Sequence, residues 1–441
     1  MRPPILIRSP SRRRLARGAG RATPWPRPAS LWRTSLRGSG RSGAKSKGGR
    51  SIPIQGRTDS QGGGASPPPL LCLGAISGTS MDAVDVAALR TDGSMVHERL
   101  GAAEYPLSAR LRAALEPVAA DPAQGRRPQP ALAELVADEF AAAIEAFCAD
   151  HRSLGAPDLV GCHGQTVLHV PAEGLSVQLC DWQRLADRLA APVVGDFRTA
   201  DLAAGGQGAP LAPLYHMMIA AERASPADYP LAVLNIGGVA NLTYVPAPAA
   251  PERLLAFDTG PGNALLDDCA RALLGEPRDE DGRCARQGQP DRAALARCEA
   301  DPFLAAPPPK AADRNQFRGW LAAVEGLAAP DALATLAAGT AAGLRRALEL
   351  LPAPPKRLFL AGGGRRNAYL AELLRSAAPA SQVEDVEALG VDGDAVEAEL
   401  FAVLAARSRL GLPCTYPGTT GAAQPCGAGR TWRPRRPGPA G

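Results

Sequence analysis

Short apolar runs alternate with segments of helical spacing between residues 70 and 421. The apolar runs predict strands at 71–76, 84–89, 159–162, 176–179, 193–195, 231–236, 239–245, 254–257 and 357–361. Apolar residues at helical spacing predict helices at 131–150, 181–189, 263–274, 330–351, 367–377 and 394–410. Such alternation predicts an α/β fold. Two of the strand pairs, at 71–89 and 231–245, bend at glycines, which indicates two related halves facing each other.

The two ends of the chain lack this pattern. Residues 1–69 are rich in Arg, Pro, Ser and Gly, and the tail from Ala422 is rich in proline. Such segments cannot bury enough apolar surface to offset the entropy lost on ordering. We therefore expect disorder at 1–69 and 422–441, a first α/β domain at 70–225 and a second at 226–421. The last helix of the second domain is able to pack back on the first.

The formal net charge of +5 hides a division along the chain. Residues 1–70 hold fifteen Lys and Arg against one acid, Asp59, and the tail from Ala422 has four Arg and no acid. The middle therefore carries −13, from 30 basic and 43 acidic residues. A basic segment can mark a nucleic-acid or membrane partner. The acidic middle argues against nucleic acid as the main partner, and a nucleic-acid role for residues 1–69 is the weaker idea.

Residues 1–69 also resemble an organelle transit peptide, because they are Arg-rich and poor in acids. We favour a simpler interpretation, translation from a start codon placed too early, because the folded pattern begins abruptly at Leu70. On that interpretation the segment is dispensable. A chain starting at Leu70 should then keep full activity and thermal stability.

Nine cysteines are scattered without a CxxC pair or a Cys/His metal spacing. Cys72, Cys148, Cys162 and Cys269 lie in apolar runs and are expected to be buried thiols. This usage fits a reducing cytoplasm, and the odd count argues against disulfide pairing. No run of about 18 or more apolar residues is present, so no membrane span and no membrane partner are expected.

Glycine, hydroxyl and carboxylate residues meet in the first glycine bend, Gly74–Asp85. Backbone N–H groups in such a turn can approach a phosphate, and Ser and Thr can add donors. Asp82 and Asp85 offer the oxygen ligands that Mg²⁺ prefers, directly or through water. An ordinary hairpin turn explains the same residues equally well. The segment is not a Walker loop, because GxxxxGK[ST] is absent from the chain.

Polar residues also follow the predicted strands at 159–162 and 193–195. His163 has the chemistry of a general base, although a lone histidine more often orients a substrate or satisfies a hydrogen bond in the core. Gln165 and Thr166 are plausible contacts of sugar hydroxyls. Asp196 follows the second strand at its carboxyl end, where α/β sheets open their crevices. Asp196 is a candidate base, or alternatively a helix cap or a partner of Arg198.

Three further glycine turns each follow a predicted strand. They lie in Asn235–Asn241, Asp258–Asn263 and Gly362–Asn367. The last one suits a nucleotide lying on the backbone, though a tight strand-to-helix turn explains it as well.

In this order, these segments closely resemble the anhydro-N-acetylmuramic acid kinases over residues 71–422. The specific segments are SGTSMD (Ser77–Asp82), CHGQT (Cys162–Thr166), GDFR (Gly195–Arg198), NIGGVANLT (Asn235–Thr243), FDTGPGN (Phe257–Asn263) and PGTTGA (Pro417–Ala422). The family belongs to the actin-like and hexokinase-like ATPases. The resemblance therefore implies two ribonuclease-H-like domains with ATP and sugar in the cleft between them.

The resemblance also implies the roles of individual residues. Asp196 matches the catalytic base. The ATP contacts implied are Gly78, Thr79, Ser80, Met81, Asp82, Ala83, Val84 and Asp85 in a first phosphate loop, Gly237 and Gly238 in a second, and Gly362, Gly363 and Asn367 in an adenosine turn. The expected substrate contacts are His163, Gln165, Thr166, Arg198, Asp201, Asp258, Thr259, Asn263 and Glu397. ATP and Mg²⁺ are the implied cofactors, and a cytoplasmic homodimer is expected.

The reaction implied is ATP-dependent opening of 1,6-anhydro-N-acetylmuramic acid with phosphorylation of its 6-oxygen, in peptidoglycan recycling. Two alternatives stay open, a kinase of the same superfamily acting on another sugar and a non-metabolic actin-like ATPase. The chain departs from the family pattern at Ala311–Asn315, where Ser-Thr-Gly-Arg-Glu is usual. Ala83 also replaces a common glycine.

Overall fold

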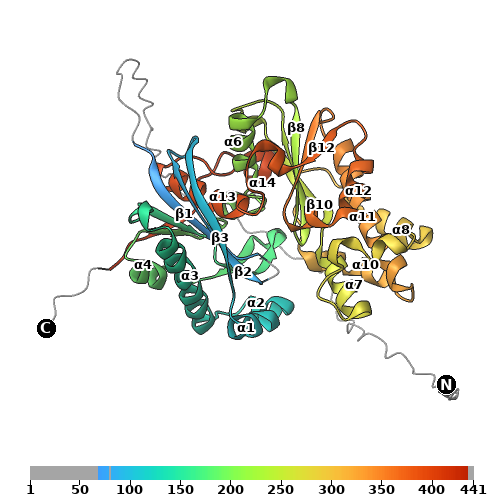
Figure 1. The fold of residues 1–441 in the computed structure, drawn as a ribbon, viewed down its shortest axis with the longest axis horizontal. Helices are drawn as coiled ribbons and strands as arrows, with labels where there is room; N and C mark the ends of the chain where they lie inside the picture. The colour runs from blue at the N-terminus through green and yellow to red at the C-terminus, as the bar shows by residue number, and fades with distance from the viewer. Residues whose placement is uncertain (1–67, 79–80, 436–441) are drawn as a thin grey trace, which may run out of the picture. The chain divides into compact units, whose positions relative to one another are not determined.

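The computed structural model describes residues 68–78 and 81–435 (Figure 1). Residues 1–69 were expected to be disordered. All of them except the last two lie outside the described residues. Thr79 and Ser80 of the first phosphate loop lie outside them as well.

Two large sheets and one small sheet organise the described residues. Their strand orders are β13-β7-β4-β1-β2-β3, β10-β9-β8-β11-β12 and β5-β6. The strands are β1 (Leu70–Ile76), β2 (Ala83–Thr91), β3 (Val96–Pro106), β4 (Leu159–Cys162), β5 (Gln165–Val170), β6 (Leu175–Leu179), β7 (Val193–Gly195), β8 (Leu231–Ile236), β9 (Val239–Val245), β10 (Leu255–Pro261), β11 (Arg357–Ala361), β12 (Gln382–Asp385) and β13 (Arg430–Trp432).

Helices cover the faces of both large sheets. They are α1 (Ala109–Ala120), α2 (Pro122–Gly125), α3 (Pro130–Asp150), α4 (Trp182–Leu189), α5 (Thr199–Ala203), α6 (Pro213–Arg223), α7 (Ala264–Leu274), α8 (Arg292–Glu299), α9 (Pro302–Ala305), α10 (Arg318–Ala323), α11 (Ala329–Glu349), α12 (Ala368–Ala377), α13 (Val396–Leu410) and α14 (Pro417–Thr420).

The two large sheets repeat one topology. In the first, β1, β2 and β3 pair antiparallel, while β4 and then β7 continue parallel on the other side of β1. In the second, β8, β9 and β10 pair antiparallel, while β11 and β12 continue parallel on the other side of β8. This is the arrangement of a ribonuclease-H-like sheet, occurring twice. The predicted α/β class with two related halves is confirmed.

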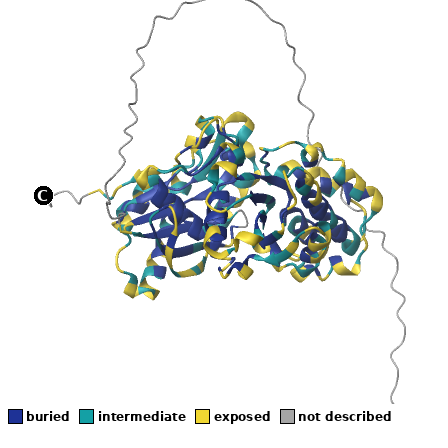
Figure 2. Ribbon diagram, turned by 90° about the horizontal axis from the view of Figure 1, so that it is seen from above, coloured by how far each residue is buried: buried dark blue, intermediate teal, exposed yellow. Residues whose placement is uncertain are grey.

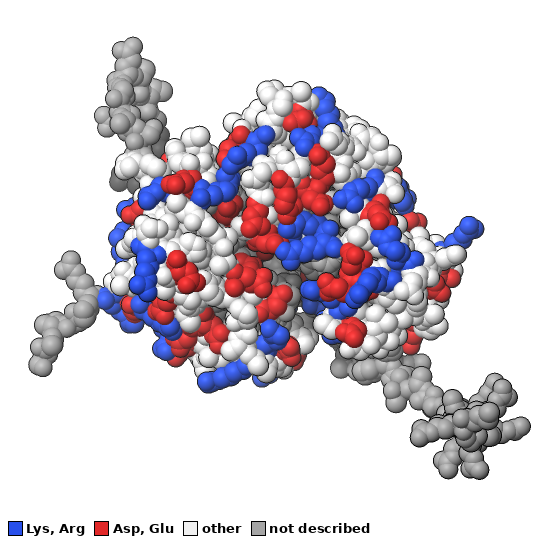
Figure 3. Space-filling view, viewed as in Figure 1, with Lys and Arg blue, Asp and Glu red and all other residues white. Residues whose placement is uncertain are grey.

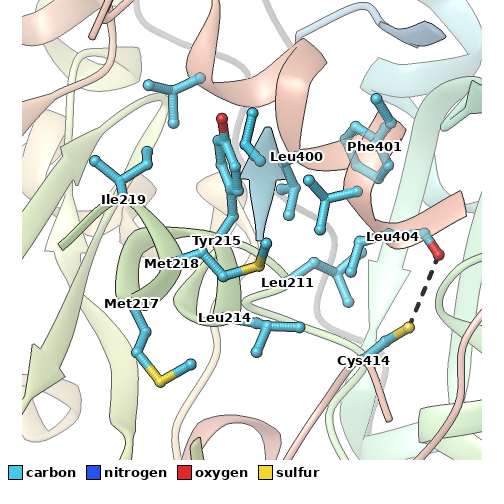
Figure 4. Close-up of a cluster of buried hydrophobic side chains, with 14 of the residues drawn as sticks. Leu211, Leu214, Tyr215, Met217, Met218, Ile219, Leu400, Phe401, Leu404 and Cys414 are labelled. Carbon is cyan, nitrogen blue, oxygen red and sulfur yellow. Dashed lines mark hydrogen bonds between the residues drawn. The ribbon is translucent and has the colours of Figure 1, made fainter. Parts of the chain in front are cut away.

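Three hydrophobic clusters hold these layers together. One lies between the first sheet and α1, α3 and α4, and includes Leu111, Phe140 and Phe147. A second covers the outer face of the second sheet with α7, α11 and α12. The third joins the two sheets, because α6 and α13 contribute side chains that pack with residues of both (Figure 4). In Figure 2 the strands form the buried interior, and exposed residues lie at the periphery.

Helix α13 lies unusually close to the first sheet because two strand residues lack a side chain. A Cβ atom on Gly74 would lie 1.8 Å from the Ala398 carbonyl oxygen, and one on Gly161 would lie 2.0 Å from that of Phe401. Both strand positions therefore exclude any larger residue. As a result, the first turn of α13, with Glu397, is fixed relative to the carboxyl ends of β1 and β4.

Among the elements that the sequence patterns did not predict are α6, β3 and β13. Helix α6 lacks a polar face, since seven of its consecutive residues from Leu214 to Ala220 are buried. Strand β3 lies at a sheet edge, where Val96 is its one buried residue, and its sequence VHERLGAAEYP contains no long apolar run.

The disorder predicted from Ala422 onward is wrong for residues 422–435. Arg430–Trp432 pair with β7, and Trp432 stacks on Trp182 with ring centroids 5.0 Å apart. Composition missed this strand because the partner, the open edge of β7, is more than 230 positions away in the sequence. Residues 436–441 lie outside the described part of the chain.

The described residues belong to one compact unit, Ala65–Gly441. The division into domains at residue 225 therefore stays a prediction. Within that unit, no helix of the described residues has the length and apolar character of a membrane span.

On the face shown in Figure 3, Lys and Arg side chains are interspersed with Asp and Glu. Among the described residues, Arg365 forms ion pairs with Glu387 and Asp394.

Candidate active site

Asp196 lies at the carboxyl end of β7 in a conformation that few residues adopt. Its φ is +52°, in the left-handed region that Asp and Asn tolerate best after glycine. The preceding Gly195 packs on Trp182, whose indole N–H donates to the Cys162 carbonyl oxygen at 3.1 Å. The Asp196 carboxylate is 15% exposed, and its Oδ2 lies 4.0 Å from Nη1 of Arg430. A weakly paired, accessible carboxylate at this position can accept a proton.

Arg198, two positions after Asp196, forms a hydrogen-bonded pair with His163. Nε of Arg198 donates to Nε2 of His163 at 3.2 Å, and Nδ1 of His163 contacts the Gly164 carbonyl oxygen at 3.1 Å. Since the guanidinium can only donate, His163 carries its proton on Nδ1. Burial, and then the charge of Arg198, hold the pKa of His163 well below its usual value. Both ring nitrogens are engaged, so His163 is poorly placed to act as a base.

Asp201 is a buried anchor for two segments. Its carboxylate accepts hydrogen bonds from the Gly208 N–H at 2.7 Å, the Thr415 hydroxyl at 2.5 Å and the Thr420 hydroxyl at 2.6 Å. These bonds tie the loop after α5 to the segment that contains α14. The contact between Asp201 and substrate stays a prediction. Most of the acceptor capacity of the Asp201 carboxylate is already used by these three donors.

Arg198 also brings together two of the predicted carboxylates. Burial lowers the pKa of Arg198 to about 10, while Asp258 and Glu397 counteract that shift. Burial raises the pKa of Asp258 to about 7, although the Ala312 N–H donates to its Oδ2 at 2.8 Å. Burial also raises the pKa of Glu397, which accepts a hydrogen bond from the Asn235 amide at 3.3 Å. The segment after β7, β10 and α13 thus converge on one cationic group.

The segment predicted to be the first phosphate loop is held by its neighbours. Met81 has a φ of +56° and its N–H donates to the Gly78 carbonyl oxygen at 3.2 Å. Nε2 of Gln165 donates to the same oxygen at 3.1 Å. Ala83 and Val84 are buried in the core, so only their backbone is available to a nucleotide. Thr166 accepts from Nε2 of Gln178 at 3.3 Å, which is the side-chain contact that the structure gives it.

Two carboxylates flank this loop. The Asp82 carboxylate accepts from the Ala83 N–H at 3.0 Å. Burial, and then the negative charges of Glu104, Glu397, Asp82 and Asp394, raise the pKa of Asp85 to about 7. The local potential is therefore negative and favours a cation.

Magnesium commonly binds through one or two carboxylates, with water and phosphate completing its shell. Among residues 68–78 and 81–435, no three His, Cys, Asp or Glu side chains are grouped as a complete metal site requires. Two carboxylates such as Asp82 and Asp85 suit a Mg²⁺ ion whose other ligands are water and the phosphates of a nucleotide.

The second phosphate loop is built on close backbone contact. Gly262 and Asn263 donate through their N–H groups to the carbonyl oxygens of Gly238 and Gly237, at 3.0 and 2.8 Å. A Cβ on Gly262 would lie 2.1 Å from the Gly237 oxygen. The Thr259 hydroxyl and the Asn263 amide donate to backbone oxygens of this hairpin, at 3.2 and 3.5 Å. Both predicted substrate contacts therefore also support the loop.

The adenosine turn follows β11. Gly362 has a φ of +75° and packs against Asn235 and Ile236, whereas Gly363 has open space where a side chain would be. Asn367 caps α12 by accepting the Leu370 N–H at 3.0 Å, so its side chain is already used within the chain.

Three polar atoms around these loops are buried without a hydrogen-bond partner among the described residues. They are the Ser77 hydroxyl, Oε1 of Gln165 and Oδ1 of Asn241. Buried polar atoms are normally satisfied. Orphaned atoms beside glycine turns fit a site that receives a polar ligand.

A cavity of about 560 Å³ lies between elements of both halves. Its lining includes His169, Gln207, Asn315 and Gln316, none of which the sequence analysis singled out as substrate contacts. The second histidine of the segment CHGQTVLH was the available signal for His169. Gln207 follows two glycines, Asn315 ends the altered Ala311–Asn315 segment and Gln316 follows it, and none of the three had a signal of its own as a substrate contact.

Comparison with known proteins identifies the family. The family model described as anhydro-N-acetylmuramic acid kinase matches residues 70–433. A protein of that name from Rhodopseudomonas palustris is 45% identical over 378 residues, covering 83% of this chain and all of the relative. One from Acidiphilium cryptum is 47% identical over 373 residues, covering 82% and 98%. A solved ROK family glucokinase from Streptomyces griseus, in complex with glucose and AMPPNP, aligns with a TM-score of 0.38 and 13% identity, covering 76% of this chain and 99% of that chain.

Two large sheets that share a ribonuclease-H-like strand order, with glycine turns between their strands, define an α/β protein. The chain belongs to the anhydro-N-acetylmuramic acid kinase family. The resemblance noted in the sequence is confirmed.

Proposed function

We propose that this chain is an ATP-dependent kinase that opens 1,6-anhydro-N-acetylmuramic acid and phosphorylates its 6-oxygen. The products are N-acetylmuramate 6-phosphate and ADP, and the role is peptidoglycan recycling. The observation that carries the proposal is Asp196, an accessible carboxylate that follows β7 within the family segment GDFR. Family membership over residues 70–433 supports the choice of substrate.

The substrate has no free 6-hydroxyl, because its 6-oxygen is bonded to the anomeric carbon. Asp196 accepts a proton from water as that water attacks the anomeric carbon. The bond between this carbon and the 6-oxygen breaks, and its electron pair stays on the 6-oxygen. The 6-oxygen then bonds to the γ-phosphorus of ATP, and ADP leaves. A general base of this kind contributes about 10²–10⁴-fold.

The phosphoryl half needs positioning and neutralisation of charge more than covalent chemistry. Backbone N–H groups of the loops at 78–85 and 237–238 would hold the phosphates. Asp82 and Asp85 would hold Mg²⁺, directly or through water, and the cation would offset phosphate charge. Arg198, Asp258 and Glu397 lie close enough to influence one another's pKa values and would orient the sugar.

Location and assembly are part of the proposal. All nine cysteines are free, and seven of them are buried, while Cys148 and Cys284 are half-buried. Free thiols in this number fit a reducing cytoplasm. A homodimer is expected, and light scattering on the purified protein measures it.

One assay separates this proposal from its alternatives. Mass spectrometry should detect a product heavier than the anhydro sugar by one water and one phosphoryl group, together with ADP. Phosphorylation of an ordinary N-acetylated hexosamine, but not of the anhydro sugar, would favour a kinase for another sugar. ATP hydrolysis without a phosphosugar would favour a non-metabolic ATPase.

A further inference from the structure

The cavity of about 560 Å³ falls within the range of about 300–1,000 Å³ typical of small-molecule sites. It is lined by Ala119, Pro122, Val167, Leu168, His169, Val170, Pro171, Ala172, Gly205, Gly206, Gln207, Ala311, Asp313, Asn315 and Gln316. The charge of Arg198 acts on His169 in this lining, so the cavity lies close to that part of the candidate active site.

His169 is the residue in this lining that has a buried side-chain polar atom without a hydrogen-bond partner among the described residues. Its Nδ1 lies 2.9 Å from the Ser176 hydroxyl, and its Nε2 is buried without a partner among the described residues. Burial, and then the charge of Arg198, lower the pKa of His169 to about 3. The imidazole is therefore neutral at physiological pH, and one of its nitrogens carries the proton.

The hydrogen bonds behind His169 determine which nitrogen that is. Nε2 of Gln178 lies 2.8 Å from the Ser176 hydroxyl oxygen, and an amide nitrogen can only donate. Ser176 accepts from Gln178, and the one other side-chain partner of its hydroxyl among the described residues is Nδ1 of His169, so its own proton is directed there. Nε2 of His169 therefore carries the hydrogen, and the ring offers an N–H donor that no described residue accepts.

The other lining residues indicate what accepts this hydrogen bond. Asp313 is the one lining residue with a formal charge, and no Lys or Arg is among them. A carboxylate in the cavity would meet a like charge and no cation. Val167, Leu168 and Ala311 give part of the wall an apolar character. A neutral group with one acceptor oxygen and one methyl group matches this combination.

We propose that His169 recognises the acetamido group of the sugar through a hydrogen bond. Nε2–H donates to the acetamido carbonyl oxygen, and the acetamido methyl packs against the apolar wall around Leu168. His169 is then a specificity-determining residue rather than a catalytic one. This inference rests on the proposed function, because it takes the anhydro amino sugar as substrate.

The test compares two substrates, the anhydro-N-acetylmuramate and an analogue in which a hydroxyl replaces the acetamido group. Wild type should prefer the first in kcat/KM by about 5- to 150-fold, which corresponds to about 1–3 kcal/mol for a lost buried hydrogen bond. His169→Phe should reduce this preference to less than about threefold, mainly by slowing the acetamido substrate. His169→Gln keeps an N–H donor near the position of Nε2 and should retain most of the preference. Thermal melting and the KM for ATP serve as controls of the fold.

The outcomes separate the two proposals. If wild type phosphorylates neither anhydro sugar, the proposed function fails and this inference fails with it. If wild type phosphorylates the acetamido substrate but His169→Phe keeps the full preference, this inference alone is wrong. An equal loss on both substrates also contradicts it, because that result indicates general positioning. If the phenyl ring prevents folding, His169→Ala is measured against the same criteria.

Discussion

The two large sheets share one strand order but present different chemistry at corresponding hairpins. The hairpin of β1 and β2 carries the carboxylates Asp82 and Asp85, and burial together with neighbouring acids raises the pKa of Asp85 to about 7. The hairpin of β8 and β9 carries Gly237, Gly238 and the uncharged Asn241. At corresponding hairpins, the first half therefore places carboxylates, and the second half places glycines and an uncharged amide. Substitutions in the first half should alter turnover, whereas those in the second should alter nucleotide affinity.

The largest expected effect is that of Asp196→Asn in the first half. Asn has the same shape and tolerates the left-handed φ, but it cannot accept a proton from water. We expect kcat to fall by about 10²–10⁴-fold, which is roughly 3–5.5 kcal/mol of barrier, with ATP and sugar binding retained. Rapid-quench kinetics and calorimetry measure the two quantities. Turnover within a few-fold of wild type would show that Asp196 is structural.

Asp201→Asn is the matched change five residues further on, and its effect should be on stability. An amide cannot accept from all three donors that surround Asp201. The free energy of unfolding should fall by about 2–4 kcal/mol, measured by urea titration. A stable variant with a raised KM for the sugar would instead support the substrate contact expected from the sequence.

The strand pattern was predictable because most strands are short apolar runs, and five of them have the predicted bounds, at 159–162, 193–195, 231–236, 239–245 and 357–361. What escaped prediction depends on distant partners. Strand β13 needs the edge of β7, and α6 is buried from Pro213 to Ala220, within a cluster that includes residues of both sheets.

Residue types and family segments likewise pointed to Asp196, Arg198 and the glycine turns. They did not reveal that the pairing of His163 with Arg198 uses both ring nitrogens. Nor did they reveal the cavity beside His169, because its walls come from segments that are about 140 positions apart in the sequence.

In the second half, adjacent glycines provide a matched pair. A Cβ on Gly364 would lie 2.2 Å from Cγ2 of Ile236, whereas one on Gly363 would meet nothing within 4 Å. Gly364→Ala should therefore destabilise the protein by about 1–3 kcal/mol. Gly363→Ala should leave the melting temperature unchanged and weaken ATP binding, because the added methyl occupies the space expected for adenosine. Unchanged ATP affinity in Gly363→Ala would place the nucleotide elsewhere.

The smallest effect concerns the two carboxyl groups whose pKa values are raised to about 7, Asp85 and Asp258. Both bind a proton more tightly in the folded than in the unfolded chain, where the pKa is about 3.9. Their contribution to stability therefore decreases as pH rises from about 4 to 7. A cation bound near Asp85 should lower its pKa and leave that of Asp258 nearly unchanged. Carbon-13 NMR titration with and without Mg²⁺ and ADP measures both groups, and equal shifts would contradict the division between the halves.

The central claim is that water, activated by Asp196, opens the anhydro bridge while the freed 6-oxygen takes the phosphoryl group. Turnover in ¹⁸O-labelled water, followed by mass spectrometry of the product and its fragments, tests this claim most directly. The account predicts one heavy oxygen on the anomeric carbon, none in the phosphate ester, and loss of both ring opening and phosphorylation in Asp196→Asn. Heavy oxygen in the phosphate group, or ring opening that continues in Asp196→Asn, would contradict it.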